Sequence, residues 1–164
     1  MTGVTHSLDP LNLRRDLAAY PTGVVAVCAL IDGRPVGMAV NSFTSISLEP
    51  PIVSVSVART STTWPRLAGS RRLGLSVLGA DQEALCRRLS SRDGDRFADA
   101  SWSTRDGGAL FLDGAALWME CSVASVVEGG DHEIILLDVV ASEMFPEVHP
   151  LLFHRSQLRP VEPR

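Results

Sequence analysis

Small hydroxyl side chains gather in one segment, residues 41–50, which lies between two apolar runs. The segment reads NSFTSISLEP, with a single aromatic residue among asparagine, serine and threonine. Ser42, Thr44, Ser45 and Ser47 can offer a row of hydrogen-bonding groups to the edge of a flat polar ring without crowding it. The alternative is a polar edge strand or loop whose serines and threonines bond to their own backbone. The segment alone favours that simpler alternative.

A second polar segment, residues 59–63, follows a predicted strand and precedes a predicted helix start. Hydroxyls and exposed backbone N–H groups at a helix start suit an anion, and the guanidinium of Arg59 suits a phosphate in charge and geometry. The alternative is a plain helix-capping motif, which the segment alone favours. Neither a Walker A motif nor a dinucleotide-binding glycine fingerprint occurs, so a Rossmann cofactor domain is not expected.

Two further groups of residues could belong to a site. Asp131 and His132 follow two glycines at a predicted hairpin turn, and histidine is the side chain that most readily changes charge near neutral pH. His132 could therefore lie beside a reacting ring, where it would position a second ligand or supply a proton. The alternative is an exposed turn histidine. Asp95, Arg96 and Phe97 could form a pocket wall, or only a loop with a weak ion pair.

The composition argues against several classes of protein. The formal net charge of −4 over 164 residues does not suit a general nucleic-acid binder. Cys28, Cys86 and Cys121 form no CxxC motif, and no histidine pair has metal-ligand spacing, so we expect buried thiols and no metal site. No apolar run reaches the ~20 residues of a membrane span, and no signal pattern opens the sequence. We therefore expect a cytoplasmic protein without a membrane partner, and no GxSxG hydrolase elbow is present.

The elements that must position these residues are predicted to be mostly strands. Asp9 and Pro10 predict the start of a short helix, and Asp32-Gly33 predicts a hairpin turn. Residues 52–57 alternate strictly, with valines on one face and two serines on the other, which indicates a strand with a polar or closely covered side. The other expected elements are strands over 23–30, 35–40, 73–78, 115–127, 133–142 and 151–153, helical turns at 62–68, a helix over 82–89 capped by Asp81, a long loop over 91–114 and a frayed tail at 160–164.

The order of these elements indicates the class of fold. The strands come in hairpins rather than in strand–helix–strand units, which favours an antiparallel barrel over a doubly wound sheet. A chain of 164 residues is long enough for one domain with a proper core.

Four segments, in this order along the chain, together resemble the flavin reductase family, which has the FMN-binding split-barrel fold. Residues 40–51, VNSFTSISLEPP, are similar to the central signature of that family, and residues 58–63 are similar to its phosphate-side loop. Residues 95–97, Asp-Arg-Phe, and residues 130–132, Gly-Asp-His, match two further landmarks. Residues 20–24 also resemble the family's usual entry into its first strand.

The resemblance implies a mainly β fold, a six-stranded antiparallel Greek-key split barrel with a few short helices. The expected domain is a single one over residues 1–164, with its core at about 10–160. A homodimer with flavin near the subunit interface is implied as well. The implied activity is reduction of FMN or FAD by NADH or NADPH, with a hydride passing from nicotinamide C4 to flavin N5, and supply of the reduced flavin to a partner monooxygenase.

The same resemblance assigns roles to residues of this sequence. His132 would lie near the reactive face of the ring, where the nicotinamide arrives, as a contributor rather than an obligatory acid or base. The serines and threonines of residues 42–47 would line the ring and ribityl chain, and those of residues 59–63 would help Arg59 to hold the phosphate. The full set of expected cofactor-binding residues is Asn41, Ser42, Thr44, Ser45, Ser47, Ala58, Arg59, Ser61, Thr63, Arg96, Phe97 and Asp131.

Two departures from the family pattern keep other functions open. Leu137 stands where the family often has glycine, and residues 154–158 lack the glycine and tyrosine common there. Either change could hinder nicotinamide binding. The second hypothesis is therefore a non-enzymatic protein that carries flavin, haem or another flat ligand in the same barrel, and the third is a flavoenzyme with its own organic substrate. The sequence does not separate FMN from FAD, or NADH from NADPH.

Overall fold

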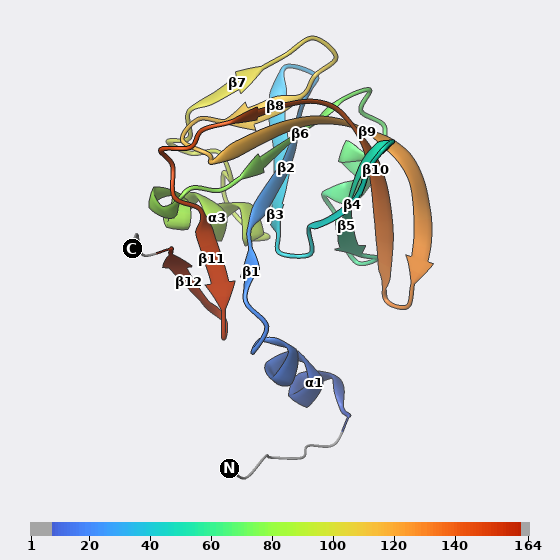
Figure 1. The fold of residues 1–164 in the computed structure, drawn as a ribbon, viewed down its shortest axis with the longest axis vertical. Helices are drawn as coiled ribbons and strands as arrows, with labels where there is room; N and C mark the ends of the chain where they lie inside the picture. The colour runs from blue at the N-terminus through green and yellow to red at the C-terminus, as the bar shows by residue number, and fades with distance from the viewer. Residues whose placement is uncertain (1–7, 162–164) are drawn as a thin grey trace.

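The computed structural model describes residues 8–161 and shows a mainly β protein with a few short helices (Figure 1). Its main sheet has seven strands, each antiparallel to its neighbours. In spatial order they are β3 (Arg34–Val40), β2 (Val25–Ile31), β6 (Leu73–Val77), β9 (Leu117–Gly129), β10 (His132–Met144), β5 (Pro51–Ala58) and β4 (Thr44–Leu48).

Smaller elements surround this sheet. A three-stranded sheet contains β1 (Thr22–Gly23), β11 (Leu151–His154) and β12 (Gln157–Pro160), and a two-stranded sheet contains β7 (Trp102–Thr104) and β8 (Leu110–Leu112). The helical segments are α1 (Pro10–Leu17), α2 (Trp64–Leu67), the 3-10 helix η1 (Ala80–Gln82) and α3 (Glu83–Ser90).

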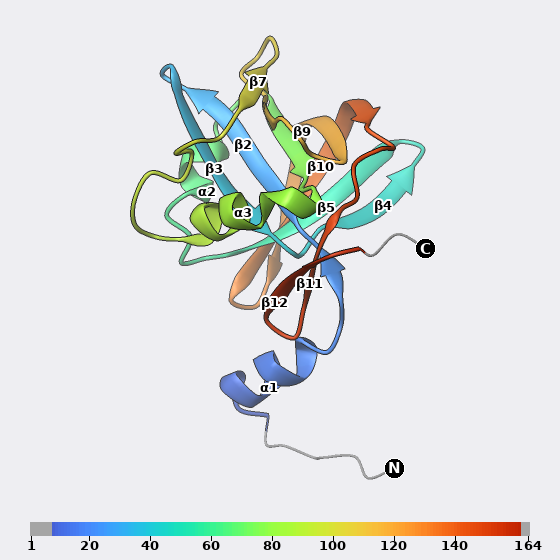
Figure 2. The same ribbon diagram turned by 90° about the vertical axis from the view of Figure 1, so that its left-hand side faces the viewer.

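The main sheet curls around its own interior (Figures 1 and 2). Its end strands β3 and β4 do not pair with each other within the described residues, so the ladder is not closed there. The expected count of six strands is wrong, because this sheet contains seven. Residues 41–43, between the two end strands, form a bend instead of a strand, so their backbone does not close the ladder.

Strand β2 is buried on both faces, which explains its continuous apolar sequence. Val25 and Val27 face the interior of the curled sheet, where they belong to the same core cluster as Val55. Ala26 and Cys28 belong to a second cluster on the opposite face, with residues of α3.

All three cysteines are buried and none forms a disulfide, as expected. Burial raises the pKa of the Cys28 thiol to about 12, and burial next to Glu120 and Asp138 raises the pKa of Cys121 to about 12. The thiols are therefore packed apolar groups and not nucleophiles.

Local signals at the start of the chain are confirmed. The Asp9 carboxylate accepts hydrogen bonds from the backbone N–H groups of Leu11, at 3.1 Å, and Asn12, at 3.0 Å, and so caps α1. Asp32 and Gly33 both have positive φ, 50° and 72°, which is the geometry of the tight turn that joins β2 to β3.

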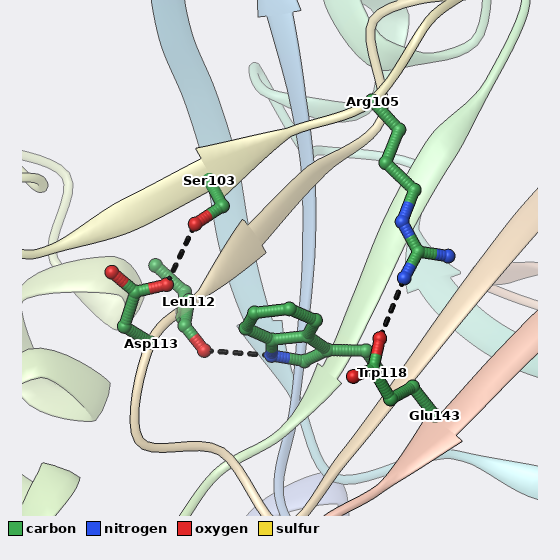
Figure 3. Close-up of polar contacts among 6 residues, drawn as sticks. All are labelled: Ser103, Arg105, Leu112, Asp113, Trp118 and Glu143. Atoms are coloured by element: carbon green, nitrogen blue, oxygen red, sulfur yellow. Dashed lines mark hydrogen bonds and ion pairs between the residues drawn. The ribbon is translucent and has the colours of Figure 1, made fainter.

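The expected long loop over 91–114 is wrong, because it contains the β7–β8 hairpin. Strands of three residues are too short for periodicity to show them. The indole N–H of Trp118 donates to the Leu112 carbonyl at 2.8 Å, and Arg105 pairs with Glu143 at 2.7 Å (Figure 3). The Ser103 hydroxyl also donates to the carboxylate of Asp113, which lies in the turn after β8, at 2.9 Å. Side chains of β9, of β10 and of this turn therefore hold the hairpin in place.

Two predictions near chain turns need correction. Asp81 does not cap the helix over 83–90; it lies inside η1, and the Gln82 side chain instead accepts a hydrogen bond from the Gly79 N–H at 2.9 Å. Pro160 belongs to strand β12 and not to a frayed tail. Residues 162–164 of the expected tail lie outside the described part of the chain.

Helix α1 lies apart from the sheets and buries none of its side chains (Figures 1 and 2). Leu11 and Leu17 of this helix, and Tyr20 just after it, are largely exposed. Among the described helices, none combines the length and apolar character that crossing a membrane requires.

Candidate functional site

The hollow that holds most of the expected site residues has a volume of about 520 Å³, within the range of small-molecule sites. It lies where the end of β3 meets the ends of β5 and β9 and the start of β10. Its lining consists of Met38, Ala39, Val40, Asn41, Ser42, Ser56, Val57, Ala58, Ser61, Gly129, His132 and Ile134. His132 is the one ionisable side chain of this lining, so the walls are otherwise neutral.

Ser42 fixes one wall of the hollow to the strand beside it. Its hydroxyl donates to the Ser56 carbonyl at 2.8 Å and accepts from the Ser56 N–H at 2.9 Å. The β4–β5 register pairs Thr44 with Ser54, and two residues further it would pair Ser42 with Ser56. A side chain therefore replaces the missing backbone pair in the ladder. Phe43, the next residue, is partly buried against the main core cluster and so anchors the same bend.

Ser61 turns the loop after β5 toward strand β3. Its hydroxyl oxygen accepts from the backbone N–H of Thr63 at 3.3 Å and from that of Trp64 at 3.1 Å. The same hydroxyl lies 3.9 Å from the sulfur of Met38, another residue of the lining. A hydroxyl thus binds the first N–H group of α2, as the simpler alternative for residues 59–63 predicts, but the N-cap residue Thr63 itself makes no side-chain capping hydrogen bond. Ser61 also borders the hollow.

His132 lies at the edge of the hollow with a carboxylate beside it. Its Nδ1 is 2.7 Å from an oxygen of Asp131. The hydrogen bond from His132, together with its charge, lowers the pKa of the Asp131 carboxyl. Since an ionised carboxylate can only accept, Nδ1 is the protonated nitrogen in this pair. The His132 side chain is 45% exposed, which leaves the other side of the ring accessible to a ligand.

Arg96, Phe97 and Thr63 support the hollow from behind rather than line it. The Arg96 guanidinium donates from Nη1 to the Gly37 carbonyl at 2.9 Å and to the Thr63 hydroxyl at 2.7 Å. Phe97 is buried against Gly37, where an added Cβ would lie 2.9 Å from its ring. These contacts join strand β3 to the loop over 59–63, so the three residues hold two walls together.

Other expected site residues lie farther from the hollow. The guanidinium of Arg59 pairs with Glu128 at 3.2 Å, and the backbone N–H of Arg59 donates to the Asp131 carbonyl at 3.0 Å. Thr44, Ser45 and Ser47 lie on edge strand β4, where the first two are exposed. The structure thus brings Asn41, Ser42, Ala58, Ser61 and His132 together in one lining; the other expected residues lie outside it.

Residues 17–162 match the family described as "Flavin reductase like domain". The chain belongs to this family. It is 39% identical over 154 residues to a flavin reductase of Pseudomonas putida, with 93% of this chain and 91% of the relative covered. It is 37% identical to the flavin-dependent monooxygenase reductase subunit HsaB of Rhodococcus jostii, with 96% and 80% covered.

A solved structure has the same fold as this protein over nearly the whole chain. It is the NADH:FAD oxidoreductase SgcE6 of Streptomyces globisporus C-1027, in complex with NAD and FAD fragments. The TM-score is 0.91 at 33% sequence identity, and the comparison covers 99% of this chain and 98% of that one.

The two departures from the flavin reductase pattern do not narrow the hollow. Leu137 is fully buried in the main core and is not part of the lining. Leu158 packs against the second core cluster.

Several lining residues were missed by sequence reasoning. Met38, Ala39 and Ile134 look like ordinary strand residues, and no pattern marks them as part of a site. Ser56 did carry a signal, because it lies on the serine face of an alternating strand.

Proposed function

We propose that this protein reduces free FMN or FAD with NADH or NADPH and supplies the reduced flavin to a partner monooxygenase. The observation that supports this proposal is the hollow of about 520 Å³ at the ends of β3, β5 and β10, in a chain of the flavin reductase family. Bound flavin would supply the hydride acceptor and bound nicotinamide the hydride.

The lining fits a flat ring with polar edges. Apolar groups of Met38, Val40 and Ile134 offer surface for the ring faces. Asn41 and Ser56 offer polar groups at the rim and along β5. Gly129 and Ala58 carry no long side chain, so they leave space for the approach of a planar ligand.

The residues of this chain orient ligands and exclude water rather than exchange protons. Ser42 and Arg96 keep the walls in place, and His132 helps to place the second ligand beside the first. We therefore expect no obligatory acid or base among them. Arg59, Ser61 and Thr63 are proposed to lie toward the phosphate, and Thr44, Ser45 and Ser47 toward the ribityl chain, as the sequence resemblance implies.

We further propose a homodimer in which exposed parts of one chain face the other. Leu11 and Leu17 of α1 present apolar surface that a second copy would cover. The expected residues of β4, which lie outside the lining of one chain, would come close to flavin at such an interface. One domain over residues 1–164, a split-barrel topology and a cytoplasmic location complete this proposal.

The test follows NADH consumption by its absorbance, in air, with FAD and then FMN added to purified protein. We expect loss of NADH that depends on added flavin. Flavin binding without NADH consumption would instead support a carrier, and NADH consumption only with an added organic compound would support a flavoenzyme with its own substrate.

A His132→Asn variant tests the role of the histidine, with His149→Asn as the control at an exposed position outside the lining. General acid–base catalysis contributes about 10²–10⁴-fold. For a residue that only positions a ligand, we expect a loss below about 100-fold. A larger loss, with unchanged flavin affinity, would contradict the absence of an obligatory acid or base.

A further inference from the structure

Strand β5 carries two serines on the same face, in different surroundings. Its valines, Val53, Val55 and Val57, are buried in the core. Ser54 and Ser56 point to the other side, because side chains alternate along a strand. Ser54 is buried between β4 and β10, where it pairs with Thr44 and Leu136 and does not line the hollow. Ser56, one step further, does line it.

The backbone of Ser56 is held on the side that faces Ser42. Both its N–H and its carbonyl bond to the Ser42 hydroxyl, at 2.9 Å and 2.8 Å. Ile134 lies opposite Ser56 on β10 and borders the same hollow. The position of the Ser56 side chain is thus fixed by strands and by a hydroxyl bridge, which is how a rigid binding group is built.

Three hydroxyls line the hollow, and their hydrogen-bonding capacity differs. The hydroxyl of Ser42 already donates its proton to the Ser56 carbonyl. The Ser61 oxygen already accepts two backbone N–H groups, and its hydroxyl lies at hydrogen-bonding distance from the Met38 sulfur. The hydroxyl of Ser56 makes no hydrogen bond with residues 8–161, so it keeps its donor and its acceptors for a ligand.

We propose that Ser56 is a flavin-binding residue whose hydroxyl hydrogen-bonds to a polar atom of the isoalloxazine ring. This inference rests on the proposed function and deepens it. The ring is the expected target rather than the phosphate, because no arginine belongs to the lining around Ser56. The Arg59 guanidinium is paired with Glu128 outside it.

The test compares Ser56→Ala with Ser54→Ala, a control that removes a serine hydroxyl from the same strand and face. Dissociation constants for riboflavin and FMN are measured by flavin fluorescence without nicotinamide. A hydrogen bond between neutral groups contributes about 0.5–1.5 kcal/mol, so Ser56→Ala should weaken both ligands by an equal factor of about 2–12. Ser54→Ala should leave both constants within about twofold.

Two further measurements separate a ring contact from loss of structure. Ser56→Thr keeps the hydroxyl, so it should bind both flavins more tightly than Ser56→Ala does. In steady-state assays, Ser56→Ala should raise the flavin KM and leave kcat nearly unchanged, the pattern of an interaction made equally before and during the reaction.

The outcomes distinguish this inference from the function on which it rests. If the unaltered protein neither binds flavin nor consumes NADH, the proposed function fails. If it does both and Ser56→Ala behaves like Ser54→Ala, the role of Ser56 is overturned and the proposed function stands. A loss for FMN alone would place the contact at the phosphate and would also overturn it.

Discussion

Replacing Arg96 with alanine should destabilise the protein strongly, although the sequence resemblance makes this arginine a cofactor ligand. Its guanidinium bonds the Gly37 carbonyl at 2.9 Å and the Thr63 hydroxyl at 2.7 Å. A hydrogen bond to a charged group contributes about 1.5–3 kcal/mol. Because Arg96 is only half-buried, the lower value applies to each bond, and the variant should lose about 3 kcal/mol of unfolding free energy.

The assay is urea unfolding followed by tryptophan fluorescence, at equal protein concentration for each variant. Arg87→Ala is the matched control, since Arg87 pairs with Glu83 at 2.7 Å on an exposed helix face. Such a surface pair contributes at most about 0.5 kcal/mol. In thermal unfolding followed by the same fluorescence, the Tm of Arg96→Ala should fall by about 6–12 °C, because each kcal/mol lowers the Tm of a chain of this size by about 2–4 °C.

Equal stability of Arg96→Ala and Arg87→Ala would refute this argument. A specific second result would restore the role expected from the sequence. If Arg96→Ala were stable, kept its affinity for riboflavin and lost its affinity for FMN, Arg96 would be a phosphate ligand instead of a support for the two walls.

Two other predictions concern stability. Gly74→Ala should cost more than about 3 kcal/mol or prevent folding, because the new Cβ would lie 2.0 Å from the Leu110 carbonyl oxygen; Gly69→Ala, with open space around it, should stay within about 0.5 kcal/mol of the parent in the same urea assay. Since burial raises the pKa of Cys28 and Cys121 from 9.0 to about 12, the folded state disfavours both thiolates. The free energy of unfolding should have its full value below about pH 9. Above that pH it should fall, by about 1.4 kcal/mol per thiol at pH 10. The chain has no lysine to titrate in that range, so a stability curve equally steep after replacing both cysteines with alanine would contradict this account.

The sequence predicted the parts of the fold that depend on local patterns. The turn at Asp32-Gly33 needs positive φ, and those residue types supply it. The alternation along 52–57 marks β5 because one of its faces is core and the other is not. The β7–β8 hairpin was not predictable in this way, since its strands are only three residues long and one of the side chains that hold it, Glu143, lies far from it in sequence.

The candidate site was only partly predictable for a related reason. Ser42 and His132 stand out in the sequence because they belong to the hydroxyl-rich segment 41–50 and to the Gly-Asp-His segment 130–132, both of which resemble landmarks of the flavin reductase family. Met38 and Ile134 do not stand out, because they line the hollow only through the curl of the sheet. The motif also drew attention to Arg96, whose partners in β3 and the loop over 59–63 become visible only in three dimensions.

The hydroxyl bridge between Ser42 and Ser56 gives the site a reporter at a single amide. The Ser56 N–H is bonded to a side chain of the bend and not to a neighbouring strand. Its exchange with deuterated solvent therefore requires the bend to move away from β5, while the rest of the ladder stays intact. The exchange rate of this one amide would measure how often the wall opens in the absence of ligand, separately from unfolding of the protein.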